Sequence, residues 1–166
     1  MRARAATVAD APAIVTIYNE GIEDGIATFE TRMRTDDDVR GWFERRRFPV
    51  VVVEVEQGSG TRIVAFAATS EYRRRECYAG IAEFSVYVAR DMRGKGAGRL
   101  AMEKLCDAAT AAGFWKLVSR VFVDNLPSRA MLRTVGFREV GIYERHARLH
   151  GTWRDVVIVE RLLGAR

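Results

Sequence analysis

Three glycines separate a predicted strand from a predicted helix in the stretch Val86-Tyr87-Val88-Ala89-Arg90-Asp91-Met92-Arg93-Gly94-Lys95-Gly96-Ala97-Gly98-Arg99. Glycine has no side chain, so the backbone can turn sharply there and approach a ligand closely. The free N–H groups at the start of a helix, together with the helix dipole, favour binding of an anion. Arginine and lysine side chains at residues 93, 95 and 99 add positive charge. The stretch therefore predicts a phosphate-binding turn in an α/β protein.

Three kinds of phosphate-binding loop compete for this stretch, and a glycine-rich turn without a ligand is a fourth interpretation. A Walker A loop requires Gly-x-x-x-x-Gly-Lys followed by Ser or Thr, and these residues do not follow that pattern. A dinucleotide-binding loop requires Gly-x-Gly-x-x-Gly near the first strand of a parallel sheet, whereas this turn lies past the middle of the chain. The third pattern, Arg-x-x-Gly-x-Gly, is met by Arg93, Gly96 and Gly98.

The periodicity of hydrophobic residues predicts the elements around this turn. Expected strands cover residues 2–7, 50–56, 62–70, 80–89, 116–123, 137–146 and 153–162. Expected helices begin at Asp10 with Pro12, at Thr35, after the glycine turn, and at Asn125 with Pro127. This order predicts an α/β fold in which helices cover a single mixed sheet, within one domain spanning residues 1–166.

The composition is that of a globular protein, with 48% hydrophobic and 30% charged residues. Apolar runs are short and interrupted by charge, and the first residues do not resemble a signal peptide, so we predict a cytoplasmic protein without a membrane partner. Cys77 and Cys106 lack partners at ligand spacing, which predicts neither a disulfide nor a metal site. The net charge of +5 suggests an anionic partner. A polyphosphate fits better than nucleic acid, because no recognition helix or aromatic-basic stripe is evident.

Residues 93–98 resemble the pyrophosphate loop of the GNAT superfamily of acetyltransferases, and the whole chain is similar to its phosphinothricin and methionine sulfone or sulfoximine N-acetyltransferases. The similar segments are Ile17-Tyr18-Asn19, Ala27 to Thr31, Tyr72 to Val88, Arg93 to Gly98, Asp124-Asn125, Gly136-Phe137 and His150-Gly151-x-Trp153-x-Asp155. The resemblance implies a GNAT fold, with a central sheet of about seven strands, flanking helices and splayed central strands. It also implies acetyl-CoA as cosubstrate, no metal, a small-molecule amine as acceptor, and a homodimer.

In that fold the strand over residues 80–89 diverges from the strand over residues 116–123, and the pantetheine arm of acetyl-CoA enters the gap. Backbone groups of the first strand would pair with the amides of the arm. The cofactor-binding residues implied by the resemblance are Val86, Tyr87, Val88, Arg93, Gly94, Lys95, Gly96, Ala97, Gly98, Arg99, Asn125 and Ser128. The residue at position 125 is equally interpreted as a helix N-cap, and the two roles are compatible.

Glu83 is the candidate catalytic residue. Strand alternation places Glu83, Ser85 and Tyr87 on one face. A carboxylate in an otherwise apolar strand is costly unless it is paired or functional. It is therefore either the partner of a nearby arginine or a general base that takes the amine proton, directly or through water. Similarity to the family strand favours the base.

Candidate substrate-binding residues lie before this strand and after the first helix. The resemblance suggests that Arg73, Arg75 and Tyr78 bind an anionic group of the acceptor, because guanidinium donors match carboxylate, phosphinate or sulfone oxygens. The alternative is a solvated basic loop. Phe29 and Glu30 match the wall of the family pocket, and ordinary packing with a surface charge is the alternative.

Leu132 occupies a position where many relatives have a tyrosine or histidine that protonates the leaving thiolate. Leucine cannot donate a proton, so the thiolate leaves unprotonated or another group serves. Two other functions compete with small-molecule acetylation. One is acetylation of a protein N-terminus or polyamine, although the basic residues 73–75 oppose a polyamine. The other is a non-catalytic CoA-binding module, which would have no use for Glu83.

Overall fold

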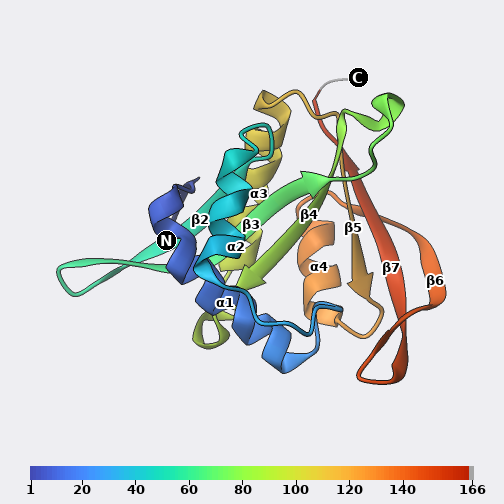
Figure 1. The fold of residues 1–166 in the computed structure, drawn as a ribbon, viewed down its shortest axis with the longest axis horizontal. Coiled ribbons are helices and arrows are strands. Elements are labelled where there is room, and N and C mark those ends of the chain that lie inside the picture. Colours follow the sequence, from blue (N-terminus) through green and yellow to red (C-terminus); the bar gives the residue numbers. More distant parts are fainter. Residues whose placement is uncertain (165–166) are drawn as a thin grey trace.

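Residues 1–164 of the chain are described by a computed structural model, in which seven strands form one sheet with helices on both faces (Figure 1). The strand order is β1-β2-β3-β4-β5-β7-β6, and the β4–β5 pair alone is parallel. The strands are β1 (Arg2–Ala5), β2 (Val50–Gln57), β3 (Gly60–Glu71), β4 (Ile81–Val88), β5 (Lys116–Phe122), β6 (Arg138–Leu149) and β7 (Thr152–Leu162). The mixed sheet predicted from the sequence is confirmed.

Four α-helices cover the sheet, two on each face: α1 (Ala11–Asp24), α2 (Asp36–Arg40), α3 (Ala97–Ala111) and α4 (Leu126–Thr134). Buried side chains of α3 and α4, such as Met102, Leu105 and Leu132, pack in one core. Ile14 of α1 and Val39 of α2 belong to the core on the opposite face. Among the described residues, no helix has both the length and the apolar character that crossing a membrane requires.

Several expected strands differ from the structure by one to three residues, and for β1 and β6 the hydrogen bonds give a reason. The first strand ends at Ala5 rather than at residue 7, because the Asp10 carboxylate accepts a hydrogen bond from the Thr7 N–H (2.8 Å) and turns the chain towards α1. The strand expected over 137–146 continues to Leu149. Its pairing with β7 shifts between residues 143 and 147, where the N–H of Arg145 donates to the Asp155 carboxylate (2.7 Å). A short helical turn (Glu76–Tyr78) also lies within the loop before β4.

Strands β4 and β5 diverge in the middle of the sheet. They pair only over Ile81–Lys116, Ala82–Leu117 and Glu83–Val118. Beyond these pairs β4 remains bonded to β3 as far as Val88, and β5 remains bonded to β7 as far as Phe122. The splayed central strands are therefore confirmed. The divergence leaves one edge of each strand open, so polar backbone groups face a gap rather than a neighbouring strand.

Candidate active site

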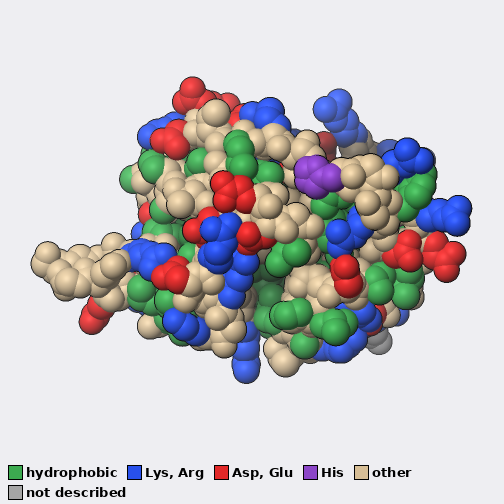
Figure 2. Space-filling view, turned by 90° about the horizontal axis from the view of Figure 1, so that it is seen from below, with side chains coloured by type: hydrophobic (Ala, Val, Ile, Leu, Met, Phe, Trp, Pro, Cys, Tyr) green, Lys and Arg blue, Asp and Glu red, His purple; other side chains and the backbone are tan. Residues whose placement is uncertain are grey.

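A cavity of about 1140 Å³ opens where β4 and β5 diverge. Its walls come from the end of α1 and the following loop, from β4 and β5, from the glycine turn, and from the first turns of α4. Figure 2 views the molecule from below, where the surface is hollowed near its centre and hydrophobic side chains lie exposed around the hollow. Cavities that hold cofactors or drug-sized ligands have volumes of this order, so the opening can hold a large ligand.

The glycine turn forms one end of the cavity. Gly96 has a φ of +87°, a left-handed conformation that side chains rarely adopt, and it directly precedes α3. The first hydrogen bond of this helix runs from the Leu100 N–H to the Gly96 carbonyl (3.1 Å). The N–H groups of residues 97–99 therefore lack acceptors within the helix, and these residues line the cavity. This is the geometry of an anion site at a helix N-terminus.

The three cations expected around the turn are placed differently. Arg93 lines the cavity, forms an ion pair with Asp24 (2.6 Å), and its Nε donates to the Val88 carbonyl (3.3 Å). Arg99 also lines the cavity and pairs with Glu103 on the next turn of α3 (2.8 Å). Lys95 is not among the lining residues, and its Nζ lies 3.9 Å from the Met92 sulfur. The structure therefore brings two of these three cations to the cavity.

The start of α4 faces the same cavity through Asn125 and Ser128. The Asn125 Oδ1 accepts a hydrogen bond from the Ser128 N–H (3.3 Å), and its Nδ2 donates to the Ile26 carbonyl (3.3 Å). Asn125 is thus a helix N-cap, and its position in the cavity wall leaves the predicted cofactor contact compatible with that role. Leu132, on the next turns of α4, is buried and also lines the cavity.

Glu83 lies at the last paired position before β4 and β5 diverge, and its side chain lines the cavity. Nη2 of Arg120, on β5, lies 2.8 Å and 3.0 Å from the two carboxylate oxygens of Glu83. The side chain of Glu83 is 29% exposed and that of Arg120 is 45% exposed. The arginine partner considered for Glu83 therefore exists, and both members of the pair remain open to the cavity.

The remaining residues of this face of β4 lie beside Glu83. Ser85 and Tyr87 both line the cavity, and alternation is visible in the packing, because Tyr87 packs against the core under α1 whereas Val86 and Val88 pack against the core under α3. Burial raises the pKa of the Tyr87 phenol above its ordinary value, so the hydroxyl stays protonated at neutral pH. Backbone groups of Val86, Tyr87 and Val88 pair with β3 on one side and face the cavity on the other.

The loop after α1 forms the roof of the cavity through Phe29 and Glu30. The Phe29 ring packs edge-on against Phe122 of β5, with centroids 4.8 Å apart. Glu30 forms an ion pair with Arg34 (2.8 Å). Asn19 of α1 holds the backbone of Arg34, accepting from its N–H (2.8 Å) and donating to its carbonyl (3.1 Å). These contacts fix the loop over the gap between the strands.

Comparisons with known proteins agree with this geometry. Residues 14–137 match the model of the acetyltransferase (GNAT) family. The chain belongs to this family. It is 29% identical over 160 residues to the L-methionine sulfoximine/L-methionine sulfone acetyltransferase of Pseudomonas aeruginosa, a match that covers 95% of this chain and 91% of the relative.

Two solved structures are similar over nearly the whole chain of this GNAT acetyltransferase. The phosphinothricin acetyltransferase of Sinorhizobium meliloti, in complex with acetyl-CoA, is 30% identical with a TM-score of 0.89, and the match covers 98% of this chain and 88% of that one. The ribosomal-protein-alanine N-acetyltransferase of Brucella melitensis is also 30% identical with a TM-score of 0.89, covering 98% and 100%. The first is a small-molecule enzyme by name and the second a protein-modifying one.

The GNAT acetyltransferase uses acetyl-CoA as its acetyl donor, and the residues present fit that cosubstrate. The helix N-terminus at the glycine turn suits a diphosphate. The open edge of β4 offers backbone donors and acceptors to the amides of an extended arm. Among residues 1–164, no three His, Cys, Asp or Glu side chains are grouped so that they could hold a metal ion.

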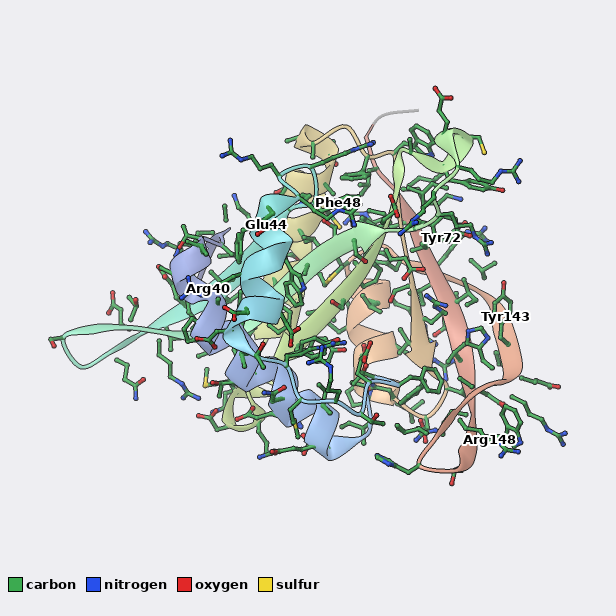
Figure 3. All side chains as sticks on the ribbon, viewed as in Figure 1. Arg40, Glu44, Phe48, Tyr72, Tyr143 and Arg148 are labelled. Carbon is green, nitrogen blue, oxygen red and sulfur yellow. The ribbon has the colours of Figure 1, made fainter. Side chains whose placement is uncertain are left out.

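The structure does not bring the residues around 73–78 into the cavity. Arg73, Arg75 and Tyr78 are absent from its lining. The Arg73 guanidinium lies over the Tyr72 ring, 5.2 Å from its centroid, and Tyr72 packs edge-on against Tyr78 (5.8 Å). Figure 3 shows Tyr72 beyond the end of β3, at the opposite end of β4 from the glycine turn. Their predicted contact with an acceptor stays a prediction.

Sequence reasoning missed several residues that line the cavity, among them Tyr18, Ser70 and Arg120. Ser70 is the partner of Glu83 across the β3–β4 pair. Arg120 lies two residues beyond Val118, which pairs with Glu83, so alternation places it on the same face of β5. An arginine within a mostly apolar strand was the available signal, but its partner depends on the register between β4 and β5.

Proposed function

We propose that this GNAT acetyltransferase acetylates the amine of a small amino-acid-like acceptor, of the phosphinothricin or methionine sulfone and sulfoximine type, with Glu83 as general base. One observation carries the proposal: the Glu83 carboxylate lines the cavity where β4 and β5 separate. The names of the Pseudomonas and Sinorhizobium relatives support this class of acceptor.

Acetyl-CoA, when bound, supplies the acetyl group as an activated thioester. An amine is protonated at neutral pH, so it has no lone pair until a base removes a proton. In the proposal Glu83 removes that proton, directly or through one water. Backbone N–H groups near Val86 polarise the carbonyl, and Phe29 and Glu30 position the acceptor from the roof. The residues predicted to bind the donor are those at 86–88, 93–99, 125 and 128.

The test is acetylation of a panel of amines by the purified protein, followed by thiol release and by mass spectrometry of the product. We expect turnover of amino-acid sulfones, sulfoximines or phosphinates. Glu83→Gln should lower kcat/KM by about 100- to 1,000-fold, because general-base catalysis contributes that much. Glu44→Gln, at an exposed position outside the cavity, is the control and should keep wild-type activity. Undiminished turnover by Glu83→Gln would exclude the base.

Acetylation of a protein N-terminus is the second candidate function. The Brucella protein, which is as similar to this chain in sequence as the Sinorhizobium enzyme is, is named a ribosomal-protein-alanine N-acetyltransferase. The same panel separates the two when it includes short peptides with N-terminal alanine. A kcat/KM for peptides that exceeds the value for every free amino acid favours the second candidate. The opposite order favours the first.

We also propose that the enzyme is a homodimer assembled through β6, the outer strand of the sheet. Val140, Ile142 and Tyr143 on this strand are exposed, and so is Trp153 on β7. Figure 3 shows Tyr143 at the outer edge of the molecule. An exposed apolar edge strand can pair with the same strand of a second copy. Sedimentation analysis should give a dimer that Ile142→Asp converts to monomer, and a monomeric wild type would exclude it.

A further inference from the structure

Arg120 forms an ion pair with Glu83 inside the cavity and uses only one of its three nitrogens to do so. A single nitrogen of its guanidinium, Nη2, contacts both oxygens of Glu83 (2.8 Å and 3.0 Å). A guanidinium carries five N–H donors in a fixed fork that binds a carboxylate through two parallel hydrogen bonds. Within residues 1–164, no hydrogen bond is formed by Nε or Nη1 of Arg120 to another protein group. Arg120 therefore has donors available for the carboxylate of an incoming ligand.

Arg120 is also the cavity arginine that lies beside the proposed base. The other two that line the cavity, Arg93 and Arg99, belong to the glycine turn and pair with acids near them. The basic residues 73 and 75, which the sequence suggested for the anionic group of the acceptor, do not line the cavity. An anion that binds near Glu83 therefore meets Arg120 first.

The spacing of the pair suits one class of acceptor. An α-amino acid carries its ammonium and its carboxylate on the same carbon, so the two groups that bind it must lie a few ångströms apart and have opposite charge. Glu83 and Arg120 satisfy both conditions, since they are in contact and project from adjacent strands on one face. A polyamine or a peptide N-terminus has no α-carboxylate to match the arginine.

We propose that Arg120 recognises the α-carboxylate of the acceptor and that its pairing with Glu83 is exchanged when the acceptor binds. Without acceptor, the guanidinium neutralises Glu83. The incoming carboxylate engages the fork of Arg120, and Glu83 is released to take a proton from the ammonium. Arg120 keeps its own proton throughout. This rests on the proposed function and makes Arg120 a specificity-determining residue for free amino acids.

The experiment compares an amino acid that the wild type acetylates with its α-carboxamide, which has the same amine but no charge at the carboxyl position. We expect the wild type to favour the acid, and Arg120→Met to lower kcat/KM for the acid by about 10- to 100-fold, the contribution of a charge-assisted hydrogen bond. The same variant should change kcat/KM for the amide by less than about threefold. Arg120→Lys should restore part of the preference.

A binding measurement complements the kinetics. Calorimetric titration of the amino acid into protein saturated with coenzyme A should show the same loss of affinity in Arg120→Met without any turnover. Arg138→Met is the matched control, because Arg138 forms a similar cross-strand pair with Glu160 (2.5 Å) outside the cavity. It should leave both substrates unaffected, and thermal unfolding verifies that each variant is folded.

The outcomes separate this inference from the proposed function. If Arg120→Met leaves the ratio of kcat/KM for the acid to kcat/KM for the amide unchanged, Arg120 does not bind the α-carboxylate. The protein would still be an amino-acid acetyltransferase. If the wild type acetylates peptides and no free amino acid, both the proposed acceptor class and this inference are wrong.

Discussion

One arginine–carboxylate cluster lies at the β1–β2 edge of the sheet, and another lies at the opening between β4 and β5. At the edge, Nε of Arg4 donates to Glu54 (2.9 Å), while Nη1 and Nη2 donate to Asp10 (2.8 Å and 2.9 Å). Asp10 is 9% exposed and Glu54 is 6% exposed. At the opening, Arg120 uses one nitrogen for one acid, and both side chains are open to the cavity.

The difference lies in how fully each arginine is coordinated. All three nitrogens of Arg4 have protein acceptors, and hydrogen bonds from Arg4 hold the pKa of Asp10 and of Glu54 below their ordinary values. Because every nitrogen of Arg4 is engaged and both acids are buried, we expect this cluster to have a structural role. The pair at the opening keeps free donors and contact with solvent. Removing each arginine in turn therefore separates a stability effect from a functional one.

The largest effect on stability is expected for Arg4→Met. The substitution leaves Asp10 without a cation and takes one of the two arginines from Glu54, whose other partner is Arg2 (2.7 Å). Breaking a buried ion pair by removing one partner costs about 3 kcal/mol or more. Urea unfolding should show this loss in the free energy of unfolding, with kcat of the remaining folded protein unchanged. A loss below about 1 kcal/mol would show that the edge cluster is as dispensable as a surface pair.

A smaller effect is expected when glycine is replaced in each region. Gly96 at the opening and Gly58 in the β2–β3 hairpin both have positive φ, +87° and +60°, and a Cβ at either position meets no atom within 4 Å. Alanine should cost about 1–2 kcal/mol of stability at both, because of the backbone conformation. In addition, Gly96→Ala should raise KM for acetyl-CoA by about tenfold. This corresponds to a loss of about 1.4 kcal/mol of binding free energy, which we expect when the N–H groups that bind the phosphate are displaced.

Gly58→Ala is the matched control for this comparison, because the hairpin lies outside the cavity. Equal KM values for acetyl-CoA in the two variants would contradict the assignment of the glycine turn to the diphosphate. A difference in stability between the two variants would not contradict that assignment, because the two turns differ in exposure and in the elements they join.

Much of the fold, and the parts of the site formed by the glycine turn and by β4, can be predicted from local patterns in the sequence. Three glycines between strand and helix predict the phosphate turn, and alternation along residues 81–88 predicts that Glu83, Ser85 and Tyr87 share a face. These patterns are visible because each depends on neighbours within a few residues. The resemblance to a family added the splay between the central strands, which no local pattern contains.

The rest depends on contacts between distant segments. Arg120 and Glu83 are 37 positions apart, and their meeting is fixed by the register of the three paired positions between β4 and β5. The position of residues 73–78 relative to the cavity also depends on contacts that the sequence does not show. Residues 73–78 are near Glu83 in sequence, but they precede the N-terminal end of β4, which lies away from the opening. Because β4 is extended, proximity along the chain does not bring them into the cavity.

A third cluster, formed by Glu139, Arg129 and Arg133, is intermediate in exposure between the other two. We expect its contribution to the free energy of unfolding to depend on pH. Glu139 on β6 accepts hydrogen bonds from Arg129 on α4 (2.8 Å), and Arg129 and Arg133 together lower its pKa from 4.5 to about 2. Because the folded-state pKa is the lower one, this stabilisation is present above about pH 4.5 and is lost as the pH falls towards 2.

Glu139→Gln should therefore lower the free energy of unfolding by about 1–2 kcal/mol at pH 7, the contribution of a hydrogen bond between charged groups. The difference between wild type and variant should shrink as the pH falls below about 4.5, because the unfolded wild type then binds a proton at Glu139 while the folded state, with its lower pKa, does not. Urea unfolding at pH 7 and at pH 3 measures it. A difference that is constant over this range would mean that the carboxylate charge does not hold α4 against β6.

The smallest effect on stability is expected for Arg120→Met, and it completes the comparison with Arg4. The Glu83–Arg120 pair is partly exposed, and exposed ion pairs contribute less than about 1 kcal/mol. Glu83 keeps access to solvent after the substitution, so no buried charge is left without a partner. The free energy of unfolding should thus change by less than about 1 kcal/mol while the acid-to-amide preference falls. A loss as large as that of Arg4→Met would instead make the pair a structural element of the sheet, and the open donors of Arg120 would then have no functional meaning.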